Sequence, residues 1–308
     1  MTRVAVTGGS GNVGRYVVKA LVDRGYDVIN LDHKQSREPA AKFSYVDLTK
    51  RDQVHRALEG VDAVCHLGEL AGPRHGAPDH VYVHNAAAGS AVLQSAAELG
   101  VKRVVYASSA HVYGCFGGPI IAPVRLPFDE THPLLPQNAY GVSKLANEAY
   151  TRFISEQYGV SAAILRLPLT LPWSMDMLTD MHWGWLKAST GPAEGFGSVL
   201  HSEDAARAFV LALENPRDGC EAYHLAAREV ISAAPLAERM KVHNPDYPAL
   251  PEDWPAFKCP LITDKIEEHL GWNPEHNLLD LYREKFGADP NEPVAPRGAQ
   301  RARHPRFH

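Results

Sequence analysis

Tyr140 and Lys144 are the residues whose types and spacing most directly indicate chemistry. They stand four positions apart within Ala139–Tyr158, a stretch whose pattern predicts a helix, so their side chains are neighbours on one helical face. The charge of a lysine favours a nearby phenolate and lowers the pKa of the tyrosine toward working pH. A tyrosine adjusted in this way can act as a general acid or base at a substrate hydroxyl.

Several polar residues follow predicted strands, where ligands bind in open α/β sheets. Ser108 and Ser109 come at the end of the apolar run Val101–Ala107. His111 lies just beyond them, and Glu69 follows another predicted strand. We take His111 as a candidate substrate contact and the serines as candidate partners of the tyrosine.

A glycine-rich loop follows the first predicted strand, Val4–Thr7. Gly8, Gly11 and Gly14 are spaced three apart, and they open a predicted helix at Val13–Arg24. Glycine lets the backbone turn tightly and approach a pyrophosphate, while the helix N-terminus supplies free N–H groups and a positive dipole end. The loop therefore predicts a dinucleotide site.

Asp32 bears on which dinucleotide is bound. It follows the predicted strand Asp27–Leu31, where a carboxylate can accept hydrogen bonds from the adenosine ribose. The same charge would repel a 2′-phosphate, which favours NAD over NADP. His33, Lys34 and Arg37 lie close behind and could receive a phosphate, so NADP stays the alternative.

Strand-like and helical stretches alternate through the first half of the chain. This order predicts an α/β fold, a Rossmann-type doubly wound parallel sheet with a smaller C-terminal substrate lobe. The remaining predicted strands are 43–46, 61–67, 162–167 and 221–225, and the remaining predicted helices are 53–58, 81–99 and 202–214. The stretch Ile231–Asn273 is rich in proline and is expected to be irregular.

The same pattern suggests domain limits. Residues 1–165 would form the NAD-binding domain, with 199–226 returning to it. Residues 166–198 and 227–287 would form the substrate lobe, and 288–308 would be a mobile basic tail.

Composition excludes several classes of protein. The net charge of −5 offers no global basic field for nucleic acid, and no apolar run is long enough to span a membrane. The four cysteines are widely spaced, which argues against a disulfide framework or a zinc knuckle. Because a strand begins at Thr2, we expect no signal peptide and a cytoplasmic location.

Motifs along nearly the whole chain resemble the extended short-chain dehydrogenase/reductase family, which comprises NAD-dependent sugar epimerases, dehydratases and dehydrogenases. The matching segments are Thr7–Gly14, Asp47-Leu48, Ser108–Gly114, Tyr140–Lys144, His201–Ala208 and Leu270–Pro274.

This resemblance implies roles for individual residues. Tyr140 would be the general acid/base, Lys144 would tune it and bind the nicotinamide ribose, and Ser109 would hold the substrate hydroxyl, with Ser108 as the alternative. The implied cofactor contacts are Gly8, Gly11, Asn12, Val13, Gly14, Asp32, Asp47, Leu48, Leu67, Gly68, Asn85, Tyr140, Lys144 and Pro168.

Three functions remain open at this stage. One is a dehydrogenase that releases reduced cofactor, another a nucleotide-sugar epimerase or dehydratase that recycles its NAD, and the third a non-catalytic NAD sensor. A nucleotide diphosphate needs cationic partners, yet Leu167–Leu200 contains Lys187 as its only lysine or arginine. We therefore expect a small carbohydrate substrate without a nucleotide.

Uronate dehydrogenases are a closer resemblance, because they share a short chain and a histidine at the place of His111. The arginine that would clamp a substrate carboxylate is missing from Ser174–Leu178, so a neutral sugar is an equal alternative. Trp173, Trp183 and Trp185 would form either a lid over the sugar or part of the core of the small lobe.

Two further expectations concern association and metals. Val81–Leu99 is rich in alanine, and small residues let helices approach closely. The resemblance implies that this helix and the Tyr140 helix form a four-helix bundle in a homodimer. His75, His80 and His84 are loosely grouped, and we interpret them as solvated or capping residues and expect no metal site.

Overall fold

A parallel β-sheet forms the centre of the protein in a computed structural model of the chain. The model describes residues 1–37, 39–117, 120–172, 194–230, 234–277, 280–281 and 284–285. The sheet has seven strands in the order β3-β2-β1-β4-β5-β6-β9, and each neighbouring pair is parallel. The strands are β1 (Arg3–Thr7), β2 (Asp27–Asp32), β3 (Lys42–Tyr45), β4 (Ala63–His66), β5 (Arg103–Ser109), β6 (Ser161–Leu167) and β9 (Cys220–His224).

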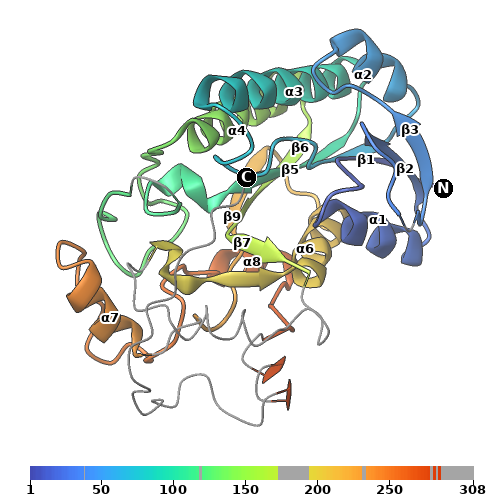
Figure 1. The fold of residues 1–308 in the computed structure, drawn as a ribbon. Helices are drawn as coiled ribbons and strands as arrows, with labels where there is room; N and C mark the ends of the chain where they lie inside the picture. Colours follow the sequence, from blue (N-terminus) through green and yellow to red (C-terminus); the bar gives the residue numbers. More distant parts are fainter. Residues whose placement is uncertain are drawn as a thin grey trace.

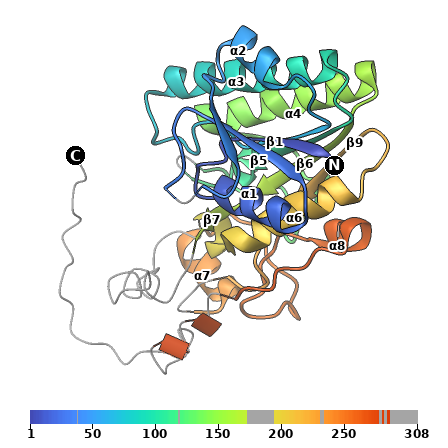
Figure 2. The same ribbon diagram turned by 90° about the vertical axis from the view of Figure 1, so that its right-hand side faces the viewer.

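Helices cover both faces of this sheet (Figures 1 and 2). On one face lie α1 (Gly14–Asp23) and α6 (Ser202–Glu214), and on the other lie α2 (Arg51–Ala57), α3 (Pro78–Glu98) and α4 (Ala139–Tyr158). The predicted Rossmann-type doubly wound fold is confirmed. Predicted and observed limits agree for α4 and α6 and differ by a few residues elsewhere.

Two apolar clusters, one on each face of the sheet, explain why the sequences of these strands are continuously hydrophobic. Alternate residues of each strand point to opposite faces, so Val4 and Val6 enter the cluster under α1 and α6, while Ala5 enters the cluster under α2, α3 and α4. A strand buried on both faces needs apolar side chains at every position.

A third cluster lies beyond the carboxyl ends of the strands and forms the core of the smaller lobe. It joins the 3-10 turn η1 (Ala110–Tyr113) and Phe128 to α7 (Leu236–His243). The lobe also contains the strand pair β7 (Leu169–Leu171) and β8 (Val199–His201) and the turn η2 (Glu194–Gly197). The helix α8 (Asp264–Leu270) packs instead on the sheet, where Ile266 and Leu270 enter the cluster under α1 and α6.

The expectation that Ile231–Asn273 is irregular was wrong in two places, because α7 and α8 lie within it. Pro235 precedes α7 as its N-cap residue, and Gly271 ends α8 in a left-handed conformation with φ of 65°. Proline before a helix and glycine after it mark helix ends rather than loops. α7 and α8 have 8 and 7 residues, too few for a clear periodic pattern.

Some sequence-based expectations lie outside the described residues. They concern Trp173, Trp183, Trp185, the stretch Ser174–Leu178 and the basic tail 288–308. Within the described part of the chain, no helix combines the length and apolar character required to cross a membrane.

Candidate active site

The glycine loop after β1 is packed too tightly to admit side chains at two of its positions. Gly8 has φ of +69°, and a Cβ atom on it would lie 2.7 Å from the Cα of Gly68, after β4. A Cβ on Gly14 would lie 2.1 Å from the carbonyl oxygen of Gly8. Only glycine permits this approach between the two loops, at the point where the strand order reverses.

The first turn of α1 is available to an anion. Its N-cap residue is Val13, which cannot supply a capping oxygen, and no acidic residue lies in the first turn. Asn12 is exposed beside it. Because an uncapped helix N-terminus presents N–H groups and a positive dipole end, the loop fits the pyrophosphate of a dinucleotide.

Asp32 is held at the end of β2 by backbone donors. Its carboxylate accepts hydrogen bonds from the N–H groups of Ser10 (3.0 Å), His33 (2.7 Å) and Lys34 (3.3 Å). Each carboxylate oxygen has two acceptor sites, so these bonds orient the group, and Oδ2, which accepts one of them, keeps a site for a ribose hydroxyl. The buried position fits the role predicted for Asp32.

Replacing this carboxylate tests the choice of cofactor. We expect Asp32→Ala to weaken NAD binding by roughly 10- to 100-fold, the cost of losing charge-assisted hydrogen bonds. The exclusion of NADP should relax at the same time. Titration of both nucleotides by calorimetry measures the effect, with Asp27→Ala, at the exposed start of the same strand, as the control. Tighter binding of NADP than NAD by the unmodified protein would contradict the role given to Asp32.

The other predicted cofactor residues surround the same edge. Leu67 and Gly68 donate their N–H groups to Thr7 Oγ1 at 3.2 and 3.1 Å, which joins the ends of β1 and β4. Leu48 packs against Gly68. Asp47 accepts two hydrogen bonds from Thr49, whose hydroxyl donation is the largest cause of the lowered pKa of that carboxyl. Pro168 is buried just after β6.

Tyr140 and Lys144 lie together at the start of α4, as their spacing predicts. The Lys144 ammonium lies 5.6 Å from the centre of the Tyr140 ring and donates a hydrogen bond of 2.7 Å to the carbonyl oxygen of Ala107. Asn138 caps the helix by accepting from the N–H of Gly141 at 2.8 Å. The helix start and the end of β5 therefore fix both catalytic candidates against the sheet.

The two serines point to different surroundings because successive strand residues face opposite sides. Ser108 Oγ donates to Glu148 Oε1 at 2.6 Å in a buried network. Ser109 Oγ accepts from the N–H of His111 at 3.3 Å and lies 3.5 Å from the carbonyl oxygen of Leu167. The hydroxyl of Ser108 is thus hydrogen-bonded inside the protein, which favours Ser109 as the serine that contacts a substrate.

His111 lies next to Tyr140, the predicted general acid/base. Its ring meets Tyr140 edge-on at 5.1 Å between centres, and Asn138 Nδ2 lies 3.2 Å from its Nδ1. Burial is the largest effect on the ring and lowers the pKa of His111 to about 4. A neutral imidazole suits a hydrogen bond to a substrate hydroxyl, and this contact stays a prediction.

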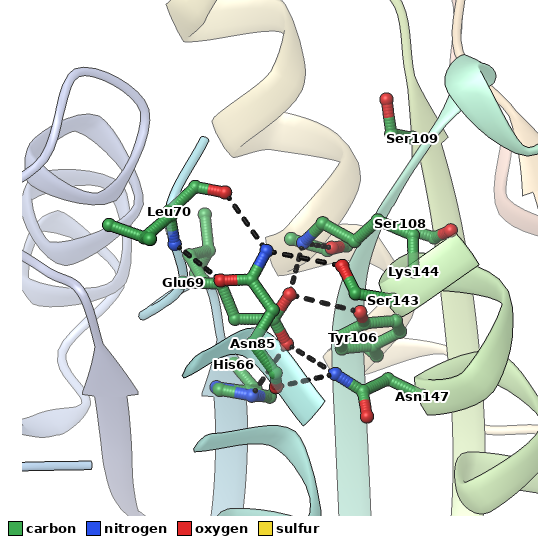
Figure 3. A network of polar contacts seen from close by, with 12 residues as sticks. His66, Glu69, Leu70, Asn85, Tyr106, Ser108, Ser109, Ser143, Lys144 and Asn147 are labelled. Carbon is green, nitrogen blue, oxygen red and sulfur yellow. Dashed lines mark hydrogen bonds and ion pairs between the residues drawn. The ribbon is translucent and has the colours of Figure 1, made fainter. Parts of the chain in front are cut away.

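One residue of this region, Glu69, has a larger part in the site than its sequence position indicates. Glu69 lies 2.7 Å from the Lys144 ammonium, and its side chain is almost fully buried (Figure 3). Its place after β4 was the available signal, but the pairing with α4 cannot be read from sequence spacing.

The side chain of Asn85 is also hydrogen-bonded within this network. Its side-chain oxygen accepts from the N–H of Leu70 at 2.8 Å, and its Nδ2 donates to the carbonyl oxygen of Leu70 and to Ser143 Oγ (Figure 3). These bonds hold the segment after β4 against α4. The cofactor contact predicted for Asn85 remains untested.

The histidines near the start of α3 do not form a compact group. The rings of His80 and His84 are 6.0 Å apart. Among the described residues, potential metal-ligating atoms converge instead at His201, Glu203 and His276. One nitrogen of each ring is engaged there by Glu203, since His201 Nδ1 accepts from the N–H of Glu203 and His276 Nε2 lies 3.1 Å from the Glu203 carboxylate.

Known proteins with similar sequences act on sugars according to their names. A UDP-glucose 4-epimerase of Azospirillum brasilense is 28% identical over 318 aligned positions, covering 90% of this chain and 89% of that protein. The L-arabinose 1-dehydrogenase (NAD(P)+) of Haloferax volcanii is 29% identical over 253 positions, covering 80% and 90%. Some epimerases match over only half their length: that of Halalkalibacterium halodurans is 31% identical over 172 positions, 53% of this chain and 49% of that protein.

Solved structures share the fold at lower identity. A short-chain dehydrogenase/reductase superfamily protein from Agrobacterium tumefaciens, with bound NAD, superposes with a TM-score of 0.69 at 23% identity and covers 92% of this chain and 95% of that one. A mutated uronate dehydrogenase gives 0.65 at 22%, covering 95% and 90%. The sequence pattern of the NAD dependent epimerase/dehydratase family matches residues 4–171, more than half of the chain. The protein therefore belongs to this NAD-dependent family.

Proposed function

We propose that the protein is an NAD-dependent dehydrogenase that oxidises a hydroxyl-bearing carbon of a small carbohydrate. The observation that carries this proposal is that Lys144 donates to Ala107, two residues before Ser109 on β5, with Tyr140 beside it, at the sheet edge that also holds the glycine loop. A non-catalytic NAD sensor would have no need for a proton-transfer set at this position.

In the proposed reaction, three residues have separate roles. Ser109 orients the substrate hydroxyl, and Tyr140 takes its proton as the C–H bond breaks. Lys144 stabilises the phenolate form of Tyr140 and offers its remaining N–H to the nicotinamide ribose, since Ala107 and Glu69 engage the other two. When bound, NAD⁺ supplies the carbon that accepts the hydride.

The distribution of positive charge supports a substrate without a nucleotide. Leu167–Leu200 has only Lys187 to offset a diphosphate. Arg207, on α6, is held by Asp204 Oδ1 at 2.9 Å and by Glu275. The similarity to an L-arabinose dehydrogenase agrees with this proposal.

The alternative is a nucleotide-sugar epimerase or dehydratase that recycles its NAD. Similarity to UDP-glucose 4-epimerases over most of the chain favours this reading. The two functions differ in the net amount of reduced cofactor that they form. A dehydrogenase produces one reduced cofactor for each turnover, and an epimerase produces none.

Turnover assays separate these possibilities. We expect absorbance at the reduced-cofactor band to rise when the protein is mixed with NAD and free aldoses or uronates, and no reaction with UDP- or GDP-sugars. Conversion of UDP-glucose to UDP-galactose without net reduced cofactor would overturn the proposal in favour of the epimerase. Binding of NAD without turnover of any of these compounds would instead support the sensor.

The homodimer remains a proposal. Apolar side chains are exposed on both helices that would form the bundle, Tyr82 and Val83 on α3 and Val142 and Phe153 on α4. Exposed apolar residues on adjacent helices are consistent with a partner surface.

A further inference from the structure

A buried carboxylate forms the centre of the polar network beside the candidate active site (Figure 3). Glu69 Oε2 lies 2.7 Å from Lys144 Nζ and accepts from Tyr106 OH at 3.3 Å. Its Oε1 accepts from Asn147 Nδ2 at 2.9 Å and lies 3.2 Å from His66 Nε2. The Glu69 side chain is 1% exposed and that of Lys144 is 5% exposed.

Both members of this pair carry charge. Burial by itself would raise the pKa of Glu69, but the Lys144 charge and the contact with His66 outweigh it and bring the pKa to about 2. Burial would lower the pKa of Lys144, and the charges of Glu69 and Tyr140 outweigh it and leave that pKa raised. Lys144 and Glu69 are therefore oppositely charged partners in the interior beside Tyr140.

Other ionisable groups face the pair from every neighbouring element. Beyond Tyr140, they are Tyr106 from β5, His66 from β4, Glu148 from α4 and His111 from η1. Tyr106 stays protonated because burial raises its pKa well above the ordinary value, and His111 is neutral at pH 7.

The charge of Glu148 is compensated separately. Its carboxylate is 2.8 Å from the guanidinium of Arg166, so it adds little net charge to the Lys144 pocket. Within the described residues, Glu69 is the carboxylate in direct contact with Lys144.

We propose that Glu69 is the resident counter-ion of Lys144, a positioning residue that holds the ammonium against the sheet and keeps the pocket close to neutral. This inference rests on the proposed function in assuming that the nicotinamide lies beside Lys144. The oxidised nicotinamide ring carries a positive charge and the reduced ring carries none. An unpaired lysine would therefore favour the reduced cofactor, and the Glu69 pair removes that bias.

The same compensation acts on the catalytic tyrosine. A lone lysine charge stabilises the phenolate, whereas a lysine paired with a carboxylate stabilises it less. Glu69 therefore moderates the effect of the Lys144 charge at Tyr140. A dehydrogenase, which must release reduced cofactor after each turnover, benefits from a pocket that does not hold that form more tightly.

The first test uses cofactor binding and needs no sugar. Glutamine at position 69 can still accept a hydrogen bond from Lys144 but has no charge. We expect Glu69→Gln to shift the ratio of the NAD⁺ and NADH dissociation constants about tenfold in favour of NADH. Tyr106→Phe is the matched control, because it removes one hydrogen bond to Glu69 without changing charge, and it should leave the ratio within about twofold. An unchanged ratio in folded Glu69→Gln would overturn the proposal.

A double variant keeps the test decisive if Glu69→Gln does not fold. Glu69→Gln/Lys144→Gln replaces the ion pair by a neutral hydrogen-bonded pair. If Glu69 compensates Lys144, the cofactor ratio of this variant matches that of the unmodified protein, since both pockets are neutral. A shift of the ratio toward NAD⁺ would mean that the charge of Lys144 was never compensated, and the proposal would be rejected.

The second test follows the pH dependence of sugar oxidation, once a substrate is known. The acid limb of kcat/KM, which reports deprotonation of the general base, should move to lower pH by about one unit in Glu69→Gln. Glu69→Asp keeps the charge and should keep the limb in place. A uniform loss of rate with no movement of the limb would identify a purely structural role. Absence of turnover would count against the proposed function and leave the cofactor test intact.

Discussion

Tyr140→Phe should lose about two to four orders of magnitude in kcat while NAD still binds. The tyrosine is the group placed to take the substrate proton, with Lys144 5.6 Å from its ring centre and His111 against its edge. Removing a proton-transfer group costs typically 10²–10⁴-fold, and phenylalanine leaves no hydroxyl to replace it. Reduced-cofactor formation from the best substrate of the sugar panel measures the loss.

The control for this variant is Tyr106→Phe, which removes another buried hydroxyl near the same lysine. Lys144 Nζ lies 5.1 Å from the Tyr106 ring centre, yet that hydroxyl faces Glu69. It should retain most of the activity. If Tyr140→Phe kept more than about a tenth of the unmodified rate, the proton would have to pass through another group.

Glu148→Ala should destabilise the fold by about 3–5 kcal/mol, because it leaves a buried arginine without its counter-ion. Arg166 donates to both carboxylate oxygens of Glu148, at 2.9 and 2.8 Å, and the side chains are 2% and 0% exposed. Ser108 loses its acceptor as well. Such a loss is a large part of the 5–15 kcal/mol typical of a whole domain. Urea denaturation followed by circular dichroism measures it.

Two variants separate the buried pair from its neighbours. Arg152 also contacts Glu148, at 3.3 Å, but is 37% exposed, so Arg152→Ala should cost less than about 1 kcal/mol. Glu148→Met/Arg166→Met removes both charges and should recover much of the loss, because apolar pairs of similar volume often replace buried ion pairs without penalty. Equal stability of Glu148→Ala and the unmodified protein would show that Arg166 is compensated elsewhere.

The sequence was sufficient for features that depend on neighbours along the chain. The glycine spacing, the Tyr140–Lys144 pair and the limits of α4 and α6 are set within a few turns or one loop. The alternation of apolar strands with amphipathic helices also predicted the parallel sheet, because both faces of such a sheet must be covered. Local periodicity carries this information directly.

The short helices α7 and α8 could not be predicted from local periodicity. α7 and α8 are stabilised by packing, since Leu236 and Met240 enter the cluster around Phe128 and Ile266 enters the cluster under α6. Helices of this length are marginal in isolation, so tertiary contacts rather than propensity decide whether they form.

The tertiary structure alone decided which charges meet. Glu69 reaches Lys144 because β4 and β5 are neighbours in the sheet and α4 packs beside them, although the residues are far apart in sequence. Strand alternation turned Ser108 toward Glu148 and left Ser109 beside His111. Sequence spacing specifies the faces of single elements, whereas the order and register of strands determine which of those faces come into contact. The pairing of Glu69 with Lys144 is therefore a property of the sheet, and the motifs that we identified do not encode it.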